Sequence, residues 1–341
     1  MRGAVLDRED APRTMVLGEE ARPSVLPTER LLPTGVCRPQ IRAELRRIAD
    51  GRNLLSIAAL WALVIGIVAA AVLIDNPFGY VAAFVVMGPI YVRFAILMHE
   101  AAHKLLFTDK RRNDWLGTWL IAYPAFAPIK LYRRAHFAHH REEFGREEPD
   151  MAFYSGYRCT PRTLARRLFR DAIGISGWKN FAALLRGVRV PAARRVVVSI
   201  LAAQLVLWGA SWAVTGRWWI YPLLWWLPWM TQWRVLNRLR SIAEHGGLEQ
   251  SKDRRVTTHN VRQSLAARVW LVPYNTGWHL AHHVDMGIPW RNLPKFHAEL
   301  VEAGYVTDAL TYSSYRALWR ELASSPVSTE LMADVDAELS A

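Results

Sequence analysis

Four apolar runs, each long enough to cross a lipid bilayer, constrain the fold of this 341-residue chain more than any other feature. A spanning helix needs about 20 mainly apolar residues. The runs form two pairs, and only three residues link the members of each pair, so the pairs are expected to be helical hairpins. We therefore predict an all-α integral membrane fold with four transmembrane helices in two hairpins, at residues 54–74, 78–98, 196–214 and 218–236. Two prolines, Pro222 and Pro228, are expected to kink the fourth span.

The basic residues predict how these spans are oriented. The net charge is +13, yet the turn at 75–77 has no Lys or Arg and the turn at 215–217 has only Arg217. The other basic residues flank the opposite ends of the spans. By the positive-inside rule the two turns face outward, and the rest of the chain with both termini is cytoplasmic. This distribution favours a membrane protein over a nucleic-acid-binding one, so no nucleic-acid partner is expected.

The polar parts of the chain suggest three regions. Residues 1–50 form an N-terminal cytoplasmic segment, in which 1–40 are expected to be mostly disordered and 41–50 to form a short amphipathic helix. Residues 51–310 form the membrane domain, with a re-entrant or interfacial element at 115–131. Residues 311–341 form an acidic C-terminal tail. Only two cysteines are present, so neither a disulfide framework nor a cysteine-ligated iron–sulfur cluster is possible.

Histidines carry the chemical signal. Eight of the 11 histidines fall in three short boxes, and the pattern H-x-x-H-H occurs twice. Positions i, i+3 and i+4 share one face of a helix, so each box directs its imidazoles one way. Neutral imidazole binds iron, zinc and copper, and so many ligands exceed one tetrahedral site, which predicts two metals. The boxes are His99 with His103, then His136, His139 and His140, and finally His279, His282 and His283.

The predicted topology brings all three boxes to the cytoplasmic side, as a shared metal site requires. His245 follows the fourth span directly and is a further candidate ligand, whereas His259 and His297 are predicted to lie outside the site. Carboxylates or amides near the boxes could fix the orientation of ligand rings through their second nitrogen. The candidates for this role are Glu100, Asp150, Glu244, Asn275 and Asp285.

A structural zinc site and a metal transporter are both less consistent with the histidine pattern. Structural zinc favours four closed ligands, often with cysteine, and nothing in the sequence has that pattern. A metal transporter places polar ligands near the middle of its spans, but these spans carry almost none apart from Arg93. A shared site for two metal ions on the cytoplasmic side remains the favoured hypothesis.

The order and spacing of the boxes resemble the membrane fatty acid desaturase superfamily, whose hallmark is H-x(3–4)-H, H-x-x-H-H and a distant H-x-x-H-H. The resemblance covers about residues 50–305. Residues 132–145 and 274–285 are most similar to the acyl-lipid and sphingolipid branch. The resemblance implies four spans under a cytoplasmic cap that binds two iron ions through the eight box histidines and His245. Some acyl-CoA members use an Asn ligand four residues before the histidine that matches His245; here Ser241 stands there.

The resemblance also implies an activity and partners. Oxidising an unactivated C–H bond requires a redox metal and O₂, which side chains cannot replace. The expected function is desaturation of a lipid acyl chain, with hydroxylation, or desaturation of a smaller amphiphile, as alternatives on the same scaffold. The His-Pro-Gly-Gly signature of a fused cytochrome b5 domain is absent, because His245 is followed by Gly246 and Gly247. A separate ferredoxin or cytochrome b5-type donor is therefore expected to supply electrons.

Overall fold

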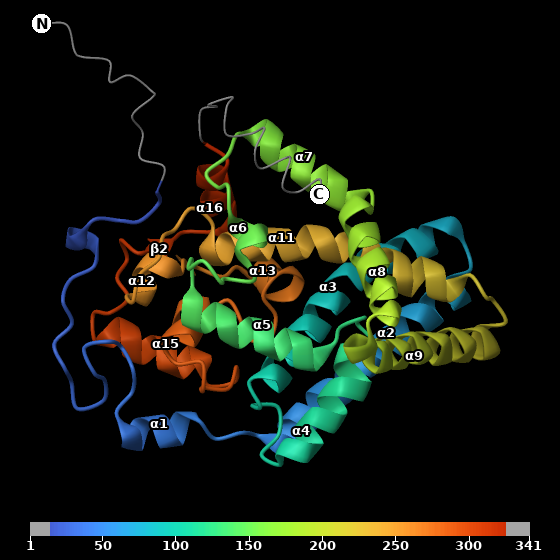
Figure 1. Ribbon diagram of the computed structural model, residues 1–341, viewed down its shortest axis with the longest axis horizontal. Helices are drawn as coiled ribbons and strands as arrows, with labels where there is room; N and C mark the ends of the chain where they lie inside the picture. The colour runs from blue at the N-terminus through green and yellow to red at the C-terminus, as the bar shows by residue number, and fades with distance from the viewer. Residues whose placement is uncertain (1–13, 325–341) are drawn as a thin grey trace, which may run out of the picture.

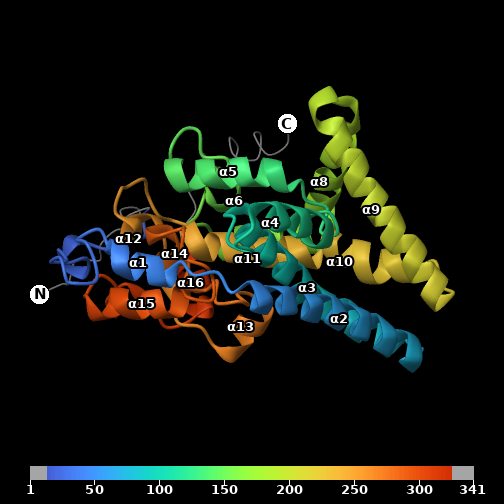
Figure 2. The same cartoon turned by 90° about the horizontal axis from the view of Figure 1, so that it is seen from below.

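The computed structural model describes residues 14–324 and is mostly helical. In Figure 2, α2, α3, α9 and α10 extend to one side, while α1, α14, α15 and α16 gather on the other. The first half of the chain contains η1 (Glu19–Ala21), α1 (Pro39–Leu45), α2 (Asp50–Ile74), α3 (Pro77–Ala102), α4 (Lys110–Leu116), η2 (Gly117–Ala122), α5 (Ile129–Glu142), α6 (Met151–Tyr154), α7 (Pro161–Ala172) and α8 (Ile175–Arg186).

The second half begins with a short helix and the long α9 (Figure 1). Its one sheet in the described range is a parallel pair, β1 with β2. The elements are η3 (Gly187–Arg189), α9 (Pro191–Thr215), η4 (Pro222–Trp226), α10 (Leu227–Met230), α11 (Gln232–His245), α12 (Arg254–Thr257), β1 (Asn260–Val261), α13 (Leu265–Trp270), α14 (His279–Val284), α15 (Leu293–Glu302), β2 (Thr311–Tyr312) and α16 (Tyr315–Leu322).

Three helical stretches in the described residues are long and apolar enough to cross a membrane: Pro39–Ile74, which contains α1 and α2, then α3 and α9. The link between α2 and α3 is a tight turn. Asp75 adopts a left-handed conformation, and the Asn76 side chain accepts a hydrogen bond from the Gly79 amide to cap α3. Arg217 bonds to Asp75 at 2.7 Å, so the turns that follow α2 and α9 meet at the same end of the molecule.

The fourth predicted span, residues 218–236, is not one continuous helix. It consists of a π-helical segment (η4), the short α10 and the start of α11, with a break at Thr231 where φ is −119° and ψ is −79°. Proline has no amide hydrogen and its ring collides with the carbonyl four residues earlier, so Pro222 and Pro228 disfavour a regular helix here, although α3 stays continuous through Pro89. The expected kink is therefore a succession of short helical segments.

The segment at 115–131 also departs from regular helix. It joins the end of α4 to the π-helical η2, turns back through Pro124 and Phe126, and enters α5. Phe126 has a φ of 60°, which reverses the chain. The side chains of Ile121, Phe126 and Ile129 are buried in the same core as those of α3. This path carries the chain from the end of α3 to the beginning of α5.

The N-terminal segment packs against α14 and α15. Leu31 and Cys37 are buried together with Leu280, Phe296 and Leu300, which belong to α14 and α15. Arg30 pairs with Glu299, and Arg42 in α1 pairs with Asp285. The expectation of disorder therefore does not hold for residues 14–40, and residues 1–13 lie outside the described range.

The region boundaries at 50 and 310 remain predictions. Beyond 310, β2 and α16 are in contact with the cap, because Leu318 and Leu322 are buried beside Ile242 of α11. The predicted tail from 325 onward lies outside the described residues.

Candidate metal centre

Four segments bring nine histidines to one place in the cap. The C-terminal end of α3 supplies His99 and His103, and His245 is the last residue of α11. The other six come from two short helices on which positions i, i+3 and i+4 share a face. They are His136, His139 and His140 on α5 and His279, His282 and His283 on α14.

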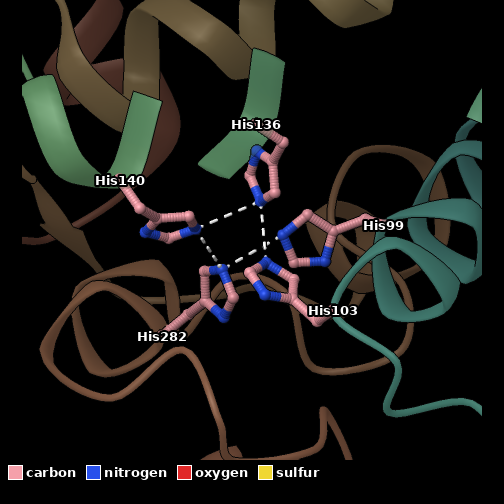
Figure 3. Close-up of side chains that lie close together, drawn as sticks. All are labelled: His99, His103, His136, His140 and His282. Carbon is pink, nitrogen blue, oxygen red and sulfur yellow. Dashed lines mark hydrogen bonds between the residues drawn. The ribbon is translucent and has the colours of Figure 1, made fainter. Parts of the chain in front are cut away.

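Five of these rings converge on a single point, as Figure 3 shows. Their Nε2 atoms face one another across short distances. That of His136 lies 2.8 Å from His103 and 3.1 Å from His140, and that of His282 lies 3.1 Å from both His140 and His99. We call this set, His99, His103, His136, His140 and His282, the first cluster.

The other four histidines form a second cluster beside the first. Nε2 of His279 lies 3.1 Å from Nε2 of His245 and 3.0 Å from Nε2 of His283. His139 joins His245 and His283, with a ring nitrogen of each within 4.8 Å of the others. The rings of His140 and His283, one from each cluster, have centroids 4.4 Å apart. The nine histidines thus divide into two adjacent nitrogen-rich sites.

Hydrogen bonds at Nδ1 orient three of the rings. The Nδ1–H of His139 donates to Glu148 at 3.0 Å, that of His283 to Glu143 at 2.5 Å, and that of His245 to the Thr257 carbonyl at 2.8 Å. A ring that donates from Nδ1 keeps the lone pair of Nε2 free. For His245 and His283 the Nε2 atom faces Nε2 of His279 in the second cluster.

Burial keeps most of these imidazoles neutral; at His139 burial lowers the pKa, but the hydrogen bond and charge of Glu148 outweigh it and raise the pKa overall. Burial lowers the pKa of His103 to about 3 and that of His279 to about 4, from an ordinary value near 6.5. Burial likewise holds the pKa of His140, His282 and His283 well below that value. Neutral imidazoles whose lone pairs face one another at about 3 Å repel unless a cation lies between them. Metal ions with a preference for nitrogen therefore match this donor set.

The predicted supporting residues have mixed outcomes. Glu100 and Glu244 place carboxylate oxygens 3.8 Å from Nδ1 of His99 and His279, too far for a hydrogen bond. Asp150 has an oxygen within 4.8 Å of the ligating atoms of His139 and Glu148. These three residues border the clusters without bonding to a ring.

The other two predicted supports bond elsewhere. Asn275 donates to the Trp290 carbonyl at 3.3 Å, and the Asp285 carboxylate pairs with Arg42 and Arg46 of α1. Neither makes a hydrogen bond to a histidine within residues 14–324. Both residues lie close to the third box in sequence, and this proximity was misleading. The partner of Asp285 is Arg42 of α1, which lies more than 200 residues earlier in the sequence.

Sequence reasoning missed Glu143 and Glu148. Both are buried, and Arg254 of α12 pairs with Glu143 at 2.6 Å while donating to the His140 carbonyl. In the sequence they stand among similar acids, Glu142 and Glu147, which offer no pattern to separate them. The two excluded histidines lie outside both clusters: His259 bonds to the Gly246 carbonyl and His297 stacks on Trp278.

A cavity of about 1450 Å³ adjoins both clusters. His99, His136, His139, His245, His279 and His282 line one part of it. Apolar side chains from α4, η2, α8 and α9 line the remainder, including Trp115, Trp119, Leu184 and Val196. The cavity therefore connects the histidines to surfaces of the helices that are long and apolar enough to cross a membrane. A long flexible molecule could reach both sites along it.

Comparison with known proteins adds two kinds of finding. The fatty acid desaturase family model matches residues 75–316, which include all nine clustered histidines. A dihydrorhizobitoxine desaturase of Bradyrhizobium elkanii is 26% identical over 240 residues, covering 63% of this chain and 66% of that protein. A ceramide hydroxylase of Caulobacter vibrioides is 26% identical over 290 residues, covering 73% of this chain and 79% of that protein.

Proposed function

Because this chain belongs to the fatty acid desaturase family, we propose that it is an O₂-dependent membrane oxidoreductase that desaturates a lipid acyl chain at a non-haem di-iron centre. The observation that carries the proposal is the convergence of nine histidines into two adjacent clusters beside a cavity of about 1450 Å³. Zinc has no redox chemistry, so two nitrogen-bound iron ions suit an oxidation better.

Each cluster would hold one ion. The first cluster has five histidines, and the second has His139, His245, His279 and His283. Two bound iron ions would supply the activation of O₂ and the oxidation of C–H bonds that no side chain provides. Desaturation removes two hydrogen atoms from the chain, and two electrons and two protons from a donor complete the reduction of O₂ to two waters.

The residues of the chain hold and orient the reactants. Glu143, Glu148 and the Thr257 carbonyl each accept a hydrogen bond from the Nδ1 of one ring, which would orient these three rings before metal binds. Apolar residues such as Trp119, Leu184 and Val196 would bind the acyl chain along the cavity. The same side chains limit the access of water to the reacting carbon.

The membrane arrangement follows from the same proposal. Residues 218–236 would make a fourth, interrupted crossing, so that the cap and both termini lie on the cytoplasmic side. A separate ferredoxin or cytochrome b5-type protein would deliver the electrons there. The excess of basic residues would favour an acidic donor.

Hydroxylation is the second candidate, because one relative is named a ceramide hydroxylase and the other a desaturase at the same 26% identity. A hydroxylase inserts one oxygen atom where a desaturase removes two hydrogens. A substrate smaller than an acyl lipid also stays open, since the desaturase relative is named for dihydrorhizobitoxine.

The test is an acyl-chain profile by mass spectrometry in a host that lacks its own desaturase. The host expresses the intact protein, His282→Ala or His297→Gln, with a ferredoxin and its reductase. We expect chains short of two hydrogens with the intact protein and with His297→Gln, which changes a histidine outside both clusters, and none with His282→Ala. Chains that gain one oxygen would instead establish a hydroxylase. An unchanged profile from protein that contains iron would contradict an acyl-lipid substrate.

A further inference from the structure

Arg234 contributes a charge to the cavity that no acidic residue neutralises. It lies on α11, whose cavity-lining face also includes Trp233, Asn237, Arg240 and Glu244. The Nε atom of Arg234 is inaccessible to solvent and has no hydrogen-bond partner among the described residues. The guanidinium carbon lies 4.2 Å above the Trp229 ring, which stabilises a cation but accepts no conventional hydrogen bond.

Asp171 is the acidic residue whose charge influences Arg234, but it forms an ion pair with a different arginine. Asp171 of α7 binds the guanidinium of Arg238 through both carboxylate oxygens and accepts a hydrogen bond from the Ser176 hydroxyl at 2.5 Å. Arg238 therefore has its counter-ion, whereas Arg234, one turn earlier on α11, does not.

Four acids line the cavity, Glu100, Asp114, Asp150 and Glu244, and none of them pairs with Arg234 among the described residues. Two of the four have basic partners. Glu244 pairs with Arg240 at 2.8 Å, and Asp114 pairs with Lys104 and Arg133. Arg240 nevertheless keeps an Nε without a partner among the described residues. Two guanidinium groups thus line the cavity, each with a buried Nε that has no hydrogen-bond partner among the described residues, and only Arg240 has a carboxylate beside it.

An unpaired guanidinium in a largely apolar cavity is costly unless a ligand supplies the missing charge. Guanidinium binds carboxylate and phosphate groups through two parallel hydrogen bonds. We propose that the substrate carries an oxyanion, a carboxylate or a phosphate, and that Arg234 is the residue that selects it. This inference rests on the proposed function, because it specifies the chemical group at one end of the substrate that we propose binds in the cavity.

The position of Arg234 would also determine which carbon is oxidised. Eleven residues of α11 separate Arg234 from His245, which corresponds to about 16 Å along the helix axis. A substrate anchored at Arg234 would lay its chain along α11 toward the clusters. The oxidised carbon would then lie at a fixed distance from the anionic end rather than from the methyl end.

Binding can be measured without turnover, on the full-length protein in nanodiscs of phosphatidylcholine, without an electron donor. The probes are dodecanoate, dodecyl phosphate and the uncharged methyl dodecanoate, each compared at equal concentration in the bilayer by displacement of labelled dodecanoate. We expect the wild-type protein to bind at least one anionic probe roughly tenfold or more tightly than the ester. The better of the two anions distinguishes a free acid from a phosphorylated substrate.

Three variants locate the effect. Arg234→Gln should remove the preference for the anion, and Arg234→Lys should retain part of it, because it keeps the charge but not the paired donors. Arg262→Gln, an exposed residue outside the cavity, should leave the preference unchanged.

Two results would overturn the inference: equal wild-type affinity for the anions and the ester, or an undiminished preference in Arg234→Gln. The wild-type comparison does not depend on any variant folding. Failure of the proposed function is distinguishable, since it would appear as absence of an oxidised product or of iron while the anion preference persists.

Discussion

At the scale of single residues, Glu143 connects the metal ligands to the rest of the cap. Its carboxylate receives the Nδ1–H of His283 and pairs with Arg254, so it fixes one ligand ring and joins α5 to α12. Burial raises the pKa of Glu143, and the nearby Arg254 opposes that shift. The carboxylate therefore depends on its cationic and imidazole partners to stay ionised in the cap.

We expect Glu143→Gln to weaken metal binding by about 10- to 100-fold, as is typical when a support of a ligand histidine is lost. The measurement is the iron content of the purified protein and its retention against a chelator. Glu142→Gln is the matched control, because Glu142 pairs with Arg141 at the surface rather than with a histidine. Equal iron retention in the two variants would show that Glu143 does not support the site.

Much of the site could be predicted at this scale, and the missing part has a physical reason. The geometry groups all nine histidines proposed from the spacing of the boxes and the position of His245. Glu143 could not be separated from Glu142, because the distinction arises where α5 ends: Glu142 is its last residue, and Glu143 leaves the helix with φ −21° and ψ 115°. Asp285 was misassigned because its partner Arg42 belongs to a segment distant in sequence.

At the scale of elements, hydropathy predicted three of the helices closely. The apolar runs at 54–74, 78–98 and 196–214 correspond to α2, α3 and α9, and each helix begins before its run because backbone hydrogen bonding continues into polar residues. The fourth run is not a single helix: it contains two prolines, which disfavour regular helix, and is interrupted at Thr231, three residues after Pro228.

Close contact between α8 and α10 depends on Gly177. A Cβ atom built there would lie 2.0 Å from the Met230 carbonyl oxygen, a backbone atom that cannot move aside alone. We expect Gly177→Ala to destabilise the protein by about 1–3 kcal/mol, the usual range for overpacking. Thermal melting in detergent measures this, with Gly209→Ala of α9 as the control because open space surrounds Gly209. Melting of Gly177→Ala at the wild-type temperature would contradict the predicted contact.

The attachment of α1 to the end of α14 depends on Asp285. Its side chain is 1% exposed and pairs with Arg42 and Arg46. Asp285→Ala should lower the melting temperature, because it removes the carboxylate that joins the two elements. Asp308→Ala removes a carboxylate from a surface pair whose Asp side chain is 94% exposed, and should leave the melting temperature unchanged. Equal losses in the two variants would argue against this role of Asp285.

At the scale of the whole molecule, the buried histidines make stability depend on pH. Burial lowers the pKa of His103 to about 3 and the pKa of His259, His279 and His297 to about 4. In the unfolded chain these groups take up protons near pH 6.5, but the folded chain does so only at lower pH. The free energy of unfolding of the metal-free protein should therefore fall as the pH drops from about 6.5 toward 4.

Buried acids act in the opposite direction. Burial raises the pKa of Asp150 and Glu143, so these groups bind protons more readily in the folded chain. His139 acts in the same direction as these acids, because burial lowers its pKa but Glu148 raises it overall. The histidines with lowered pKa outnumber these groups, and we expect a net loss of stability. The measurement is the melting temperature of chelator-treated protein across this pH range. A constant melting temperature, or one that rises on acidification, would refute the expectation.

The attachment of the N-terminal segment has a consequence for biosynthesis. Arg30 and Leu31 pack against Glu299 and Leu300, which are translated some 270 positions later. The N-terminal segment therefore cannot form these contacts until most of the chain has been synthesised. Contacts so distant in sequence form late, because closing a long loop costs entropy before the contact stabilises it. While the spans insert, this segment is without the surface it will cover, and a chaperone or the translocon has time to bind it. Docking of the segment onto α14 and α15 would then be one of the last folding steps. It could occur only after α14, which carries the third histidine box, has been synthesised.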